Sequence, residues 1–242
     1  MEFDLTEIFR SALTVKILYQ DKRVVAVHKP EGQLVIPGRG PATGLCLKEE
    51  CANDLARGVF VVHRIDRETS GLVLFALDAE SHRFLSRAFE RREVAKEYRA
   101  VVSGAPHPAD GFVDSPLRLF GSGRVAADPR GKPSRTDYAT LARWADGALL
   151  SVRPLTGRQH QIRTHLAERG HPVFGDSLYG PAPRPVGGIP RLLLHAAGLK
   201  FPHPDGGERD LWCEPSDSFK VLLNVVSKSK IVYLGGREGT RQ

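Results

Sequence analysis

The sequence predicts a single α+β domain built around a largely antiparallel sheet. Candidate strands outnumber candidate helices, and the connections between them suit hairpins as much as crossovers. The regular alternation of strand and helix that is typical of a doubly wound parallel sheet is absent. The sequence also shows no interdomain linker and no repeat with a period of roughly 20–50 residues, which argues against a solenoid or a propeller.

The first predicted strand is Val24–His28, a short apolar run rich in β-branched residues. The Gly- and Pro-rich stretch Glu31–Gly44 is expected to be a loop, and Gly44–Arg57 a short helix. Two further apolar runs, Val59–Val62 and Leu72–Leu77, are predicted to be buried strands that flank a polar segment.

A helix is predicted next, because Asp78 is a good N-cap and apolar residues recur at helical spacing up to about Arg92. Ala95–Val102 is the following strand, with Tyr98 and Ala100 on one face. The rest of the chain is expected to form three connections (Gly104–Asp110, Phe120–Lys132 and Pro181–Pro190), three strands (Thr136–Ala142, Ala148–Val152 and Leu192–Leu199) and two helices (Gly157–Arg169, capped by Thr156, and Ser216–Ser227).

Composition indicates a globular protein of a reducing compartment. Hydrophobic residues make up 41% of the 242 residues and charged residues 26%, which is ordinary for such a chain. The longest apolar run, Leu72–Leu77, is far short of the roughly 20 residues that cross a bilayer. Met1–Arg10 carries three acidic residues where a secretory signal has basic ones, and three cysteines cannot all pair. We therefore expect a cytoplasmic protein without a membrane segment.

The charge balance favours a polyanionic partner. The chain has a net charge of +7 and an isoelectric point near 9.5. Nucleic acid is the first candidate and an anionic membrane surface the second.

Several common site types are not signalled. No phosphate-binding G-x-x-x-x-G-K-[ST] loop, strand-linked G-x-G-x-x-G or G-x-S-x-G nucleophile motif occurs. Cys46 and Cys51 are five positions apart, and Cys213 has no nearby histidine pair, so inert thiols are favoured over a zinc site.

The segment Val61–Leu74 is the first candidate for chemistry, because charged and hydroxyl side chains crowd between two apolar runs. Asp66 stands between Arg64 and Arg67, and nearby cations favour an ionised carboxylate. That environment suits a nucleophile or a base, and it does not suit a proton donor. The residues alone equally allow a structural ion-pair cluster followed by a turn.

Two further segments support a nucleic-acid site. Leu155–Leu166 contains four basic side chains and is expected to be helical, and a helix N-terminus also favours phosphate. A solvated basic helix is the alternative for this segment. Lys96–Tyr98 places an aromatic ring beside a lysine in a strand, where it could stack on a base or simply pack in the core.

Taken together and in order, these segments resemble the RluA-type family of RNA pseudouridine synthases. The resemblance extends over residues 17–215. The matching segments are Lys29-Pro30, His63–Gly71 (HRIDRETSG), Lys96–Ala100 (KEYRA), Thr156–Leu166 (TGRQHQIRTHL), His171–Asp176 (HPVFGD) and Arg191–Ala196 (RLLLHA).

The resemblance implies an enzyme that converts uridine within RNA to its C5-glycoside isomer, without cofactor or metal. It implies a mixed, mostly antiparallel sheet with flanking helices and a central basic cleft. Asp66 corresponds to the catalytic aspartate, Tyr98 to a tyrosine against the uracil ring, and Arg163 to an arginine that pairs with the aspartate. Further substrate-binding residues implied by the matching motifs are Arg64, which is associated with displacing the target base, and His63, Arg158, His160, Gln161, Leu193 and Leu194.

The resemblance also bears on organisation and substrate. We expect an N-terminal extension over residues 1–16, a catalytic domain over 17–224 and a C-terminal tail over 225–242. An N-terminal S4-type RNA-binding domain, carried by many relatives, is expected to be absent. The chain resembles short members that act on large-subunit ribosomal RNA, transfer RNA or both, and we expect a monomer. Gly38–Thr43 and Pro116–Arg135 are candidate loops for RNA recognition.

Sequence leaves the chemical route and two rival functions open. Asp66 could act as a nucleophile at ribose C1′ or uracil C6, or as a base toward the sugar. One rival is a non-catalytic RNA-binding protein of the same fold. The other is a base-excising N-glycosidase, although ordinary glycoside hydrolysis needs a second carboxyl group that stays protonated.

Overall fold

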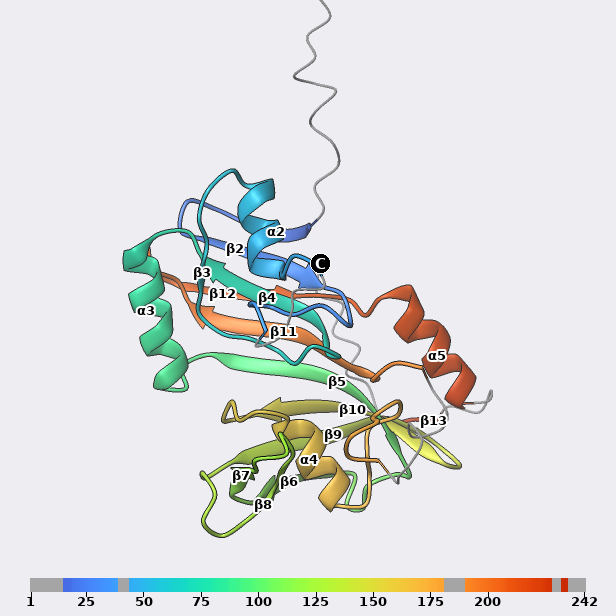
Figure 1. Ribbon diagram of the computed structural model, residues 1–242. Helices are drawn as coiled ribbons and strands as arrows, with labels where there is room; N and C mark the ends of the chain where they lie inside the picture. Colours follow the sequence, from blue (N-terminus) through green and yellow to red (C-terminus); the bar gives the residue numbers. More distant parts are fainter. Residues whose placement is uncertain (1–14, 39–43, 181–189, 228–231, 235–242) are drawn as a thin grey trace, which may run out of the picture.

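The computed structural model describes residues 15–38, 44–180, 190–227 and 232–234 (Figure 1). Their elements, in chain order, are β1 (Lys16–Gln20), β2 (Val24–Lys29), α2 (Leu47–Asp54), β3 (Phe60–Val61), β4 (Ser70–Ala76), α3 (Ala79–Glu90), β5 (Ala95–Ser103), β6 (Asp110–Asp114), β7 (Leu117–Leu119), β8 (Val125–Ala127), β9 (Arg135–Trp144), β10 (Gly147–Pro154), α4 (Gln161–Glu168), β11 (Leu194–Pro202), β12 (Glu208–Trp212), α5 (Asp217–Ser227) and β13 (Val232–Tyr233).

One long mixed sheet organises the molecule, in the order β1-β2-β4-β11-β5-β10-β9-β13. The β4–β11 pair is parallel, through the partners His195 with Ser70 and Ala196 with Gly71, and the other described pairs are antiparallel. Strands β3, β6 and β12 add to it at the side, while β7 and β8 form a separate two-stranded ribbon. The expected mixed, mostly antiparallel sheet is confirmed.

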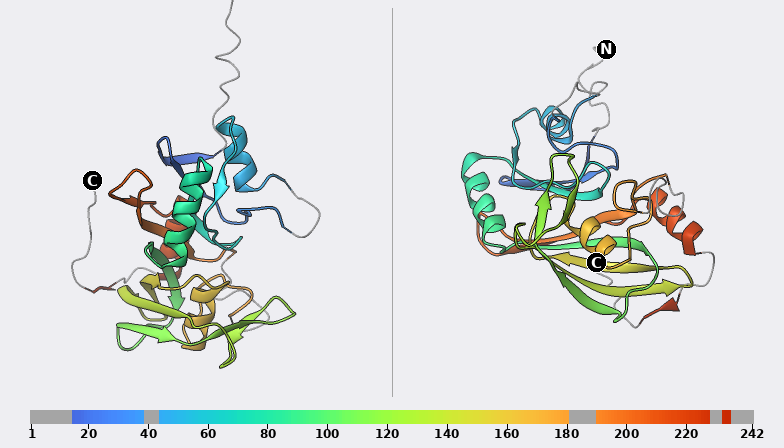
Figure 2. Two further views of the ribbon diagram at one scale, coloured as in Figure 1. Left: turned by 90° about the vertical axis from the view of Figure 1, so that its left-hand side faces the viewer. Right: turned by 60° about the horizontal axis from the view of Figure 1, so that its bottom comes forward.

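Alternation along the strands sends side chains to two faces, and helices cover both (Figure 2). Helix α2 packs with Val25, Val27 and Phe75 on one face, and α3 packs with Ala26 and Leu74 on the other. Toward the other end of the sheet, α4 contributes Ile162 and Leu166 to a core with Ala100, Leu150 and Val152. Helix α5 contributes Phe219 and Val226 to a core with Val101 and Leu193.

Most predicted elements are found near their expected positions. The N-cap of α3 is confirmed, because the Asp78 carboxylate accepts hydrogen bonds from the Ser81 backbone N–H and from its hydroxyl, both at 2.8 Å. Strands β1, β6, β7 and β12 were not predicted, and β8 lies within the predicted connection Phe120–Lys132. No described helix is long and apolar enough to cross a bilayer.

The structure bears on the expected boundary of the catalytic domain and on two of the expected loops. Helix α5 extends beyond residue 224, the expected end of the catalytic domain, and β13 within the expected tail pairs with β9. Residues 39–43 and 181–189, which hold most of one candidate RNA loop and of one predicted connection, lie outside the described residues.

The cap predicted for α4 was wrong. This helix begins at Gln161 and has His160 as N-cap, in the left-handed conformation with φ of 51°. Thr156 does not cap it, because its hydroxyl bonds to the Gln161 side-chain oxygen at 2.6 Å and accepts the Arg135 backbone N–H at 3.2 Å. Residues 157–160 therefore form a tight loop at the helix start.

The start of β4 is tied closely to β11. Gly71 has φ of +120°, and a Cβ atom there would collide with the backbone of Ala196. Next to it, the Ser70 hydroxyl bonds to His195 Nδ1 at 2.9 Å and accepts from Arg191 Nη2 at 2.9 Å. Burial lowers the pKa of His195 to about 4, so its ring is neutral and its Nε2–H donates to the Cys213 carbonyl at 2.9 Å. These contacts fix the point at which the polar segment before β4 enters the sheet.

We predict that Gly71→Ala lowers the free energy of unfolding by about 2–4 kcal/mol, because the methyl group meets backbone and the left-handed φ disfavours a side chain. Gly58→Ala is the matched control, since a Cβ atom at Gly58 would meet nothing within 4 Å. Urea unfolding of both variants measures the difference. Equal midpoints for the two variants would show that the β4–β11 approach is not tight.

Candidate active site

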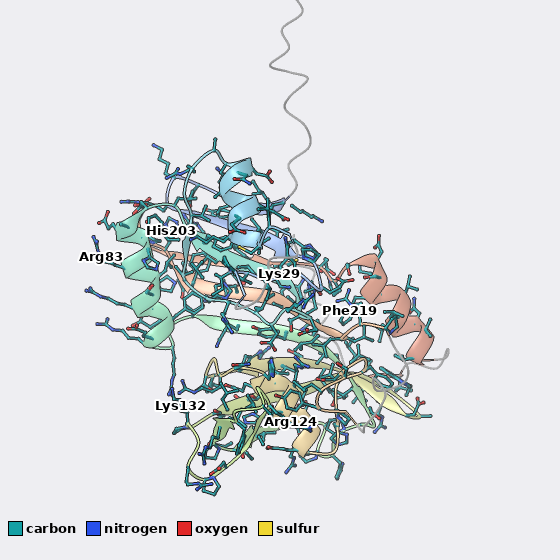
Figure 3. The ribbon with its side chains drawn as sticks, viewed as in Figure 1. Lys29, Arg83, Arg124, Lys132, His203 and Phe219 are labelled. Carbon is teal, nitrogen blue, oxygen red and sulfur yellow. The ribbon has the colours of Figure 1, made fainter. Side chains whose placement is uncertain are left out.

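The segment that carries Asp66 is held by a buried lysine. Lys29 lies at the end of β2 (Figure 3). It donates three hydrogen bonds from Nζ, to the carbonyls of Pro30 and Gln33 at 2.8 Å and of Arg67 at 2.9 Å. Burial lowers the pKa of Lys29 to about 8, against the opposing charges of Glu68 and Asp66. One ammonium group therefore joins the loop after β2 to the segment before β4.

Arg163, on α4, is the guanidinium next to Asp66. Its side chain is only 3% exposed, and its Nη1 lies 3.7 Å from Asp66 Oδ2 and 3.6 Å from Glu68 Oε2. From the residues alone, Arg64 and Arg67, the sequence neighbours of Asp66, were expected to take this role, but neither forms an ion pair with Asp66. Arg67 donates its Nε–H to the Gly32 carbonyl at 2.9 Å, and Arg64 is exposed and makes no ion pair within the described residues.

A second carboxylate holds Arg163 from behind. Asp176, whose side chain is fully buried, accepts Arg163 Nε at 2.7 Å and Nη2 at 2.9 Å, and also the backbone N–H groups of Leu178 and Tyr179. Burial by itself would raise the pKa of Asp176, but these hydrogen bonds and the charge of Arg163 outweigh it and lower the pKa. The bidentate geometry turns Nη1, the remaining nitrogen, toward Asp66.

These groups open into a cleft of about 540 Å³. Asp66 is 21% exposed there, and Tyr98 enters from β5. Burial, and then the charge of Asp66, raise the pKa of Tyr98, so its ring stays neutral. The predicted site residues that line the cleft are His63, Arg64, Asp66, Tyr98, Arg158, His160, Gln161, Arg163 and Leu194.

Leu193 does not line the cleft, which corrects that prediction. Its side chain is fully buried in the core with Val101 and Phe219, while Leu194 faces the cleft. Successive residues in extended backbone point to opposite faces, so only one of the pair can line the cleft.

Two further cations at the cleft, Arg92 and Lys96, were not among the predicted site residues. Lys96 Nζ donates to the Thr156 carbonyl at 2.9 Å and so links β5 to the loop before α4. Burial, and then the charge of Arg92, lower the pKa of Lys96 to about 8. Arg92 adopts a left-handed φ of 63°, unusual for a residue with a side chain, and lines the cleft near the end of α3.

Several cleft side chains are already committed to protein partners. The Gln161 amide is buried and donates to the Arg135 carbonyl at 2.9 Å and to the Thr136 hydroxyl at 3.0 Å. His63 accepts the Leu74 backbone N–H on Nε2 at 2.9 Å and stacks on Phe89. Burial lowers the pKa of His63 to about 3, so this ring is neutral. Both residues therefore shape the cleft wall more than they offer charge.

In the described parts of the chain, no three His, Cys, Asp or Glu side chains gather so as to hold a metal ion. Cys46, Cys51 and Cys213 are buried free thiols. The chemistry on offer at the cleft is that of a carboxylate beside a fixed guanidinium, a neutral phenol ring and a rim of cations.

Known proteins share this sequence and fold. The family model for RNA pseudouridylate synthase matches residues 23–168. The dual-specificity RNA pseudouridine synthase RluA of Escherichia coli (strain K12) is 38% identical over 205 residues, which cover 83% of this chain and 93% of that protein. The ribosomal large subunit pseudouridine synthase D of Nitrosomonas europaea is 36% identical over 228 residues, 89% of this chain and 66% of that protein.

A solved structure agrees. That of the human RNA pseudouridylate synthase domain containing 4 superposes with a TM-score of 0.72 at 28% identity, and covers 90% of this chain and 95% of that one. With a matching family model, relatives above 30% identity over most of the chain and the same fold, the chain belongs to the RluA family of RNA pseudouridine synthases, which are RNA isomerases.

Proposed function

We propose that this chain isomerises specific uridines of large-subunit ribosomal RNA, transfer RNA or both, and that Asp66 is its catalytic residue. The observation that carries the proposal is the position of the Asp66 carboxylate, in the cleft and 3.7 Å from the guanidinium of a nearly buried Arg163. The relatives named above are described as acting on ribosomal RNA or on more than one RNA, which supports the choice of substrate.

The reaction is an isomerisation with a simple balance. The bond from ribose C1′ to uracil N1 breaks, the uracil turns, and C1′ bonds to C5. The C5 hydrogen leaves as a proton, and N1 gains one. Asp66 can assist as a nucleophile at C1′ or C6, or as a base toward the sugar, and each role uses a carboxylate, which here lies 3.7 Å from the Arg163 guanidinium.

Tyr98 is proposed to hold the base. Its neutral ring lines the cleft with Leu194, and a ring face of this kind stacks on a pyrimidine with a gain of roughly 1–3 kcal/mol. The detached uracil must stay in place while it turns, so a wall of aromatic and aliphatic groups also keeps water from it.

The rim cations are proposed to bind the RNA backbone. Arg64, Arg92, Lys96 and Arg158 line the same cleft, so a phosphate chain crossing it would meet positive charge on several sides. A target inside a stem must leave its stack, at a cost of a few kcal/mol. Arg64 is exposed and unpaired among the described residues, which suits a side chain that occupies the vacated position.

The structure favours isomerase over N-glycosidase chemistry. Hydrolysis with two carboxyl groups needs one of them kept as an acid, normally in an apolar setting. Glu68, the nearby candidate, is half exposed and shares the guanidinium of Arg163, so it lacks that setting.

We predict that Asp66→Asn and Asp66→Ala abolish pseudouridine formation while RNA binding stays within about threefold of wild type, because the rim cations remain. The measurement uses unmodified ribosomal and transfer RNA transcripts with tritium at uridine C5. Wild-type protein should release tritium to water without free uracil. Asp137→Asn, a change of the same kind outside the cleft, should leave the rate unchanged.

The rivals make different predictions in this assay. Free uracil from the wild-type reaction would identify an N-glycosidase. Full tritium release by Asp66→Asn, or none by wild type, would refute the proposed role of Asp66 or the proposed activity.

We predict that Asp176→Asn costs about 3–5 kcal/mol of stability, because it leaves the buried Arg163 without its charged partner. Asp137→Asn, which breaks a pair whose two side chains are 40% exposed, should cost less than about 1 kcal/mol. Urea unfolding at neutral pH measures both. Equal costs for the two variants would contradict the role given to Asp176.

The cost of Asp176→Asn should also depend on acid. Because folding lowers the pKa of Asp176, its stabilising effect is complete above the unfolded value of about 3.9 and disappears as pH falls through the lower folded value. The difference between wild type and variant should therefore be constant from about pH 5 to 7 and shrink below about pH 4. A difference that does not shrink in acid would show that the carboxylate charge is not its source.

We predict that RNA affinity falls roughly threefold to tenfold as pH rises through about 8, where Lys96 loses its proton and its attraction for phosphate. Lys96→Met should bind more weakly at pH 7 and lack this step, and filter binding from pH 6.5 to 9.5 measures both. If the step persists in Lys96→Met, another group, such as Lys29, is responsible.

A further inference from the structure

We propose that Tyr179 is a positioning residue that couples the β7–β8 ribbon to His160 and Arg163 at the cleft. This inference rests on the proposed function, since it concerns how RNA bound by the ribbon would influence isomerisation. Tyr179 follows Asp176 in the turn after α4, is 8% exposed and does not itself line the cleft.

On the cleft side, Tyr179 contacts both residues directly. Its hydroxyl lies 2.8 Å from His160 Nδ1, and the Arg163 guanidinium carbon lies 5.2 Å from its ring centroid. Its backbone N–H donates to Asp176 Oδ1 at 3.0 Å, so it also steadies the carboxylate that orients Arg163.

On the other side, Tyr179 is a docking point for the ribbon. The Val125 backbone N–H of β8 donates to its hydroxyl at 3.0 Å, and Leu117 of β7 joins Val125 and Tyr179 in one small core. The guanidinium of exposed Arg124 lies 5.5 Å from the same ring. Two isolated strands are marginally stable, so contacts such as this one help to determine where the ribbon lies.

The Tyr179 hydroxyl hydrogen-bonds to the ribbon and to a cleft histidine at the same time. A phenol hydroxyl can donate one hydrogen bond and accept others. Here its oxygen accepts the Val125 N–H at 3.0 Å and also bonds to His160 Nδ1 at 2.8 Å, so one hydroxyl joins the ribbon to the cleft histidine. Burial, although the charge of Asp66 opposes it, lowers the pKa of His160, which agrees with a neutral ring. A shift of the ribbon would therefore change the hydrogen bonding of a cleft histidine.

The ribbon carries groups that suit RNA. Arg118 lies over the exposed ring of Phe120, with 5.4 Å from guanidinium carbon to ring centroid, and Arg124 is exposed at the other strand. Arginine and aromatic side chains of this kind contact phosphates and bases. RNA engaged there would fix the ribbon, and through Tyr179 it would fix His160 and Arg163.

The test compares Tyr179→Phe with wild type on the tritium-labelled transcripts, with protein in excess over RNA. Phenylalanine keeps the ring over Arg163 and loses two hydrogen bonds. The single-turnover rate should fall about tenfold. The RNA dissociation constant should stay within about twofold. Tyr19→Phe is the matched control, because its hydroxyl also has two partners, Asp21 and Arg209, and does not line the cleft.

A double-mutant cycle separates coupling from general loosening. His160→Ala should add little to Tyr179→Phe but should add fully to Tyr19→Phe, because residues that act as a unit are non-additive. Glu168→Ala removes another ribbon tether, the 2.7 Å bond from the Ala127 N–H, and should slow the reaction less than Tyr179→Phe. Melting curves identify any variant that fails to fold. If that variant is Tyr179→Phe, Glu168→Ala with His160→Ala gives a second cycle, which should be non-additive, because a ribbon loosened at Glu168 acts on His160 through Tyr179.

The outcomes are distinct. No product from wild-type protein would refute the proposed function and this inference with it. With an active wild type, a Tyr179→Phe rate equal to that of Tyr19→Phe, full additivity with His160→Ala, or an equal loss in Glu168→Ala would refute the coupling alone.

Discussion

The site depends on one nearly buried guanidinium shared by three carboxylates. A nearly buried charge such as that of Arg163 is strongly destabilising without a partner, and the fully buried Asp176 supplies one through two hydrogen bonds. That pairing leaves one nitrogen, Nη1, for Asp66 and Glu68 at the cleft. Because the guanidinium is planar and held at its far edge, it faces Asp66 in a fixed orientation before any RNA arrives. The cost of burying the Arg163 charge is therefore offset by Asp176, which lies on the side of the guanidinium away from Asp66.

The sheet brings these groups together from distant parts of the chain. Asp66 comes from the segment before β4, Tyr98 from β5 and Arg163 from α4, and the parallel contact of β4 with β11 sets the first of these relative to the others. Gly71 permits that contact, and Lys29 ties the Asp66 segment to the loop after β2. A strand thus holds Tyr98, a short helix holds Arg163, and a segment tied down by Lys29 holds Asp66, which fits a reaction that must keep a detached base in place.

Sequence predicts the interior of this fold better than its edges. Continuous apolar runs identified β2 and β4, and the Asp78 cap identified α3, because burial and capping leave local signals. Strands β6, β7 and β12 are short and partly exposed, and their backbone partners, not their side chains, make them strands. Leu193 was wrongly predicted to line the cleft, because side chains alternate between the two faces of an extended segment and only that of Leu194 faces the cleft. The guanidinium beside Asp66 comes from Arg163, far along the chain, and not from adjacent Arg64 or Arg67. The charges next to Asp66 in sequence did not indicate it, and only the family resemblance pointed to Arg163. Asp176 was noted only as the last residue of the HPVFGD segment. Its role comes from its contact with Arg163, which the sequence does not show.

The proposed function requires that a uridine of the RNA reaches Asp66 and lies between it and Tyr98. The structure of the Asp66→Asn protein bound to an unmodified RNA substrate tests this most directly. In this structure we expect one nucleotide to be turned out of its stack, with its base against the Tyr98 ring. Residue 66 should lie beside the sugar or the base of that nucleotide, and Arg163 should still be paired with Asp176. RNA bound outside the cleft, or a base held away from residue 66, would contradict the proposed function.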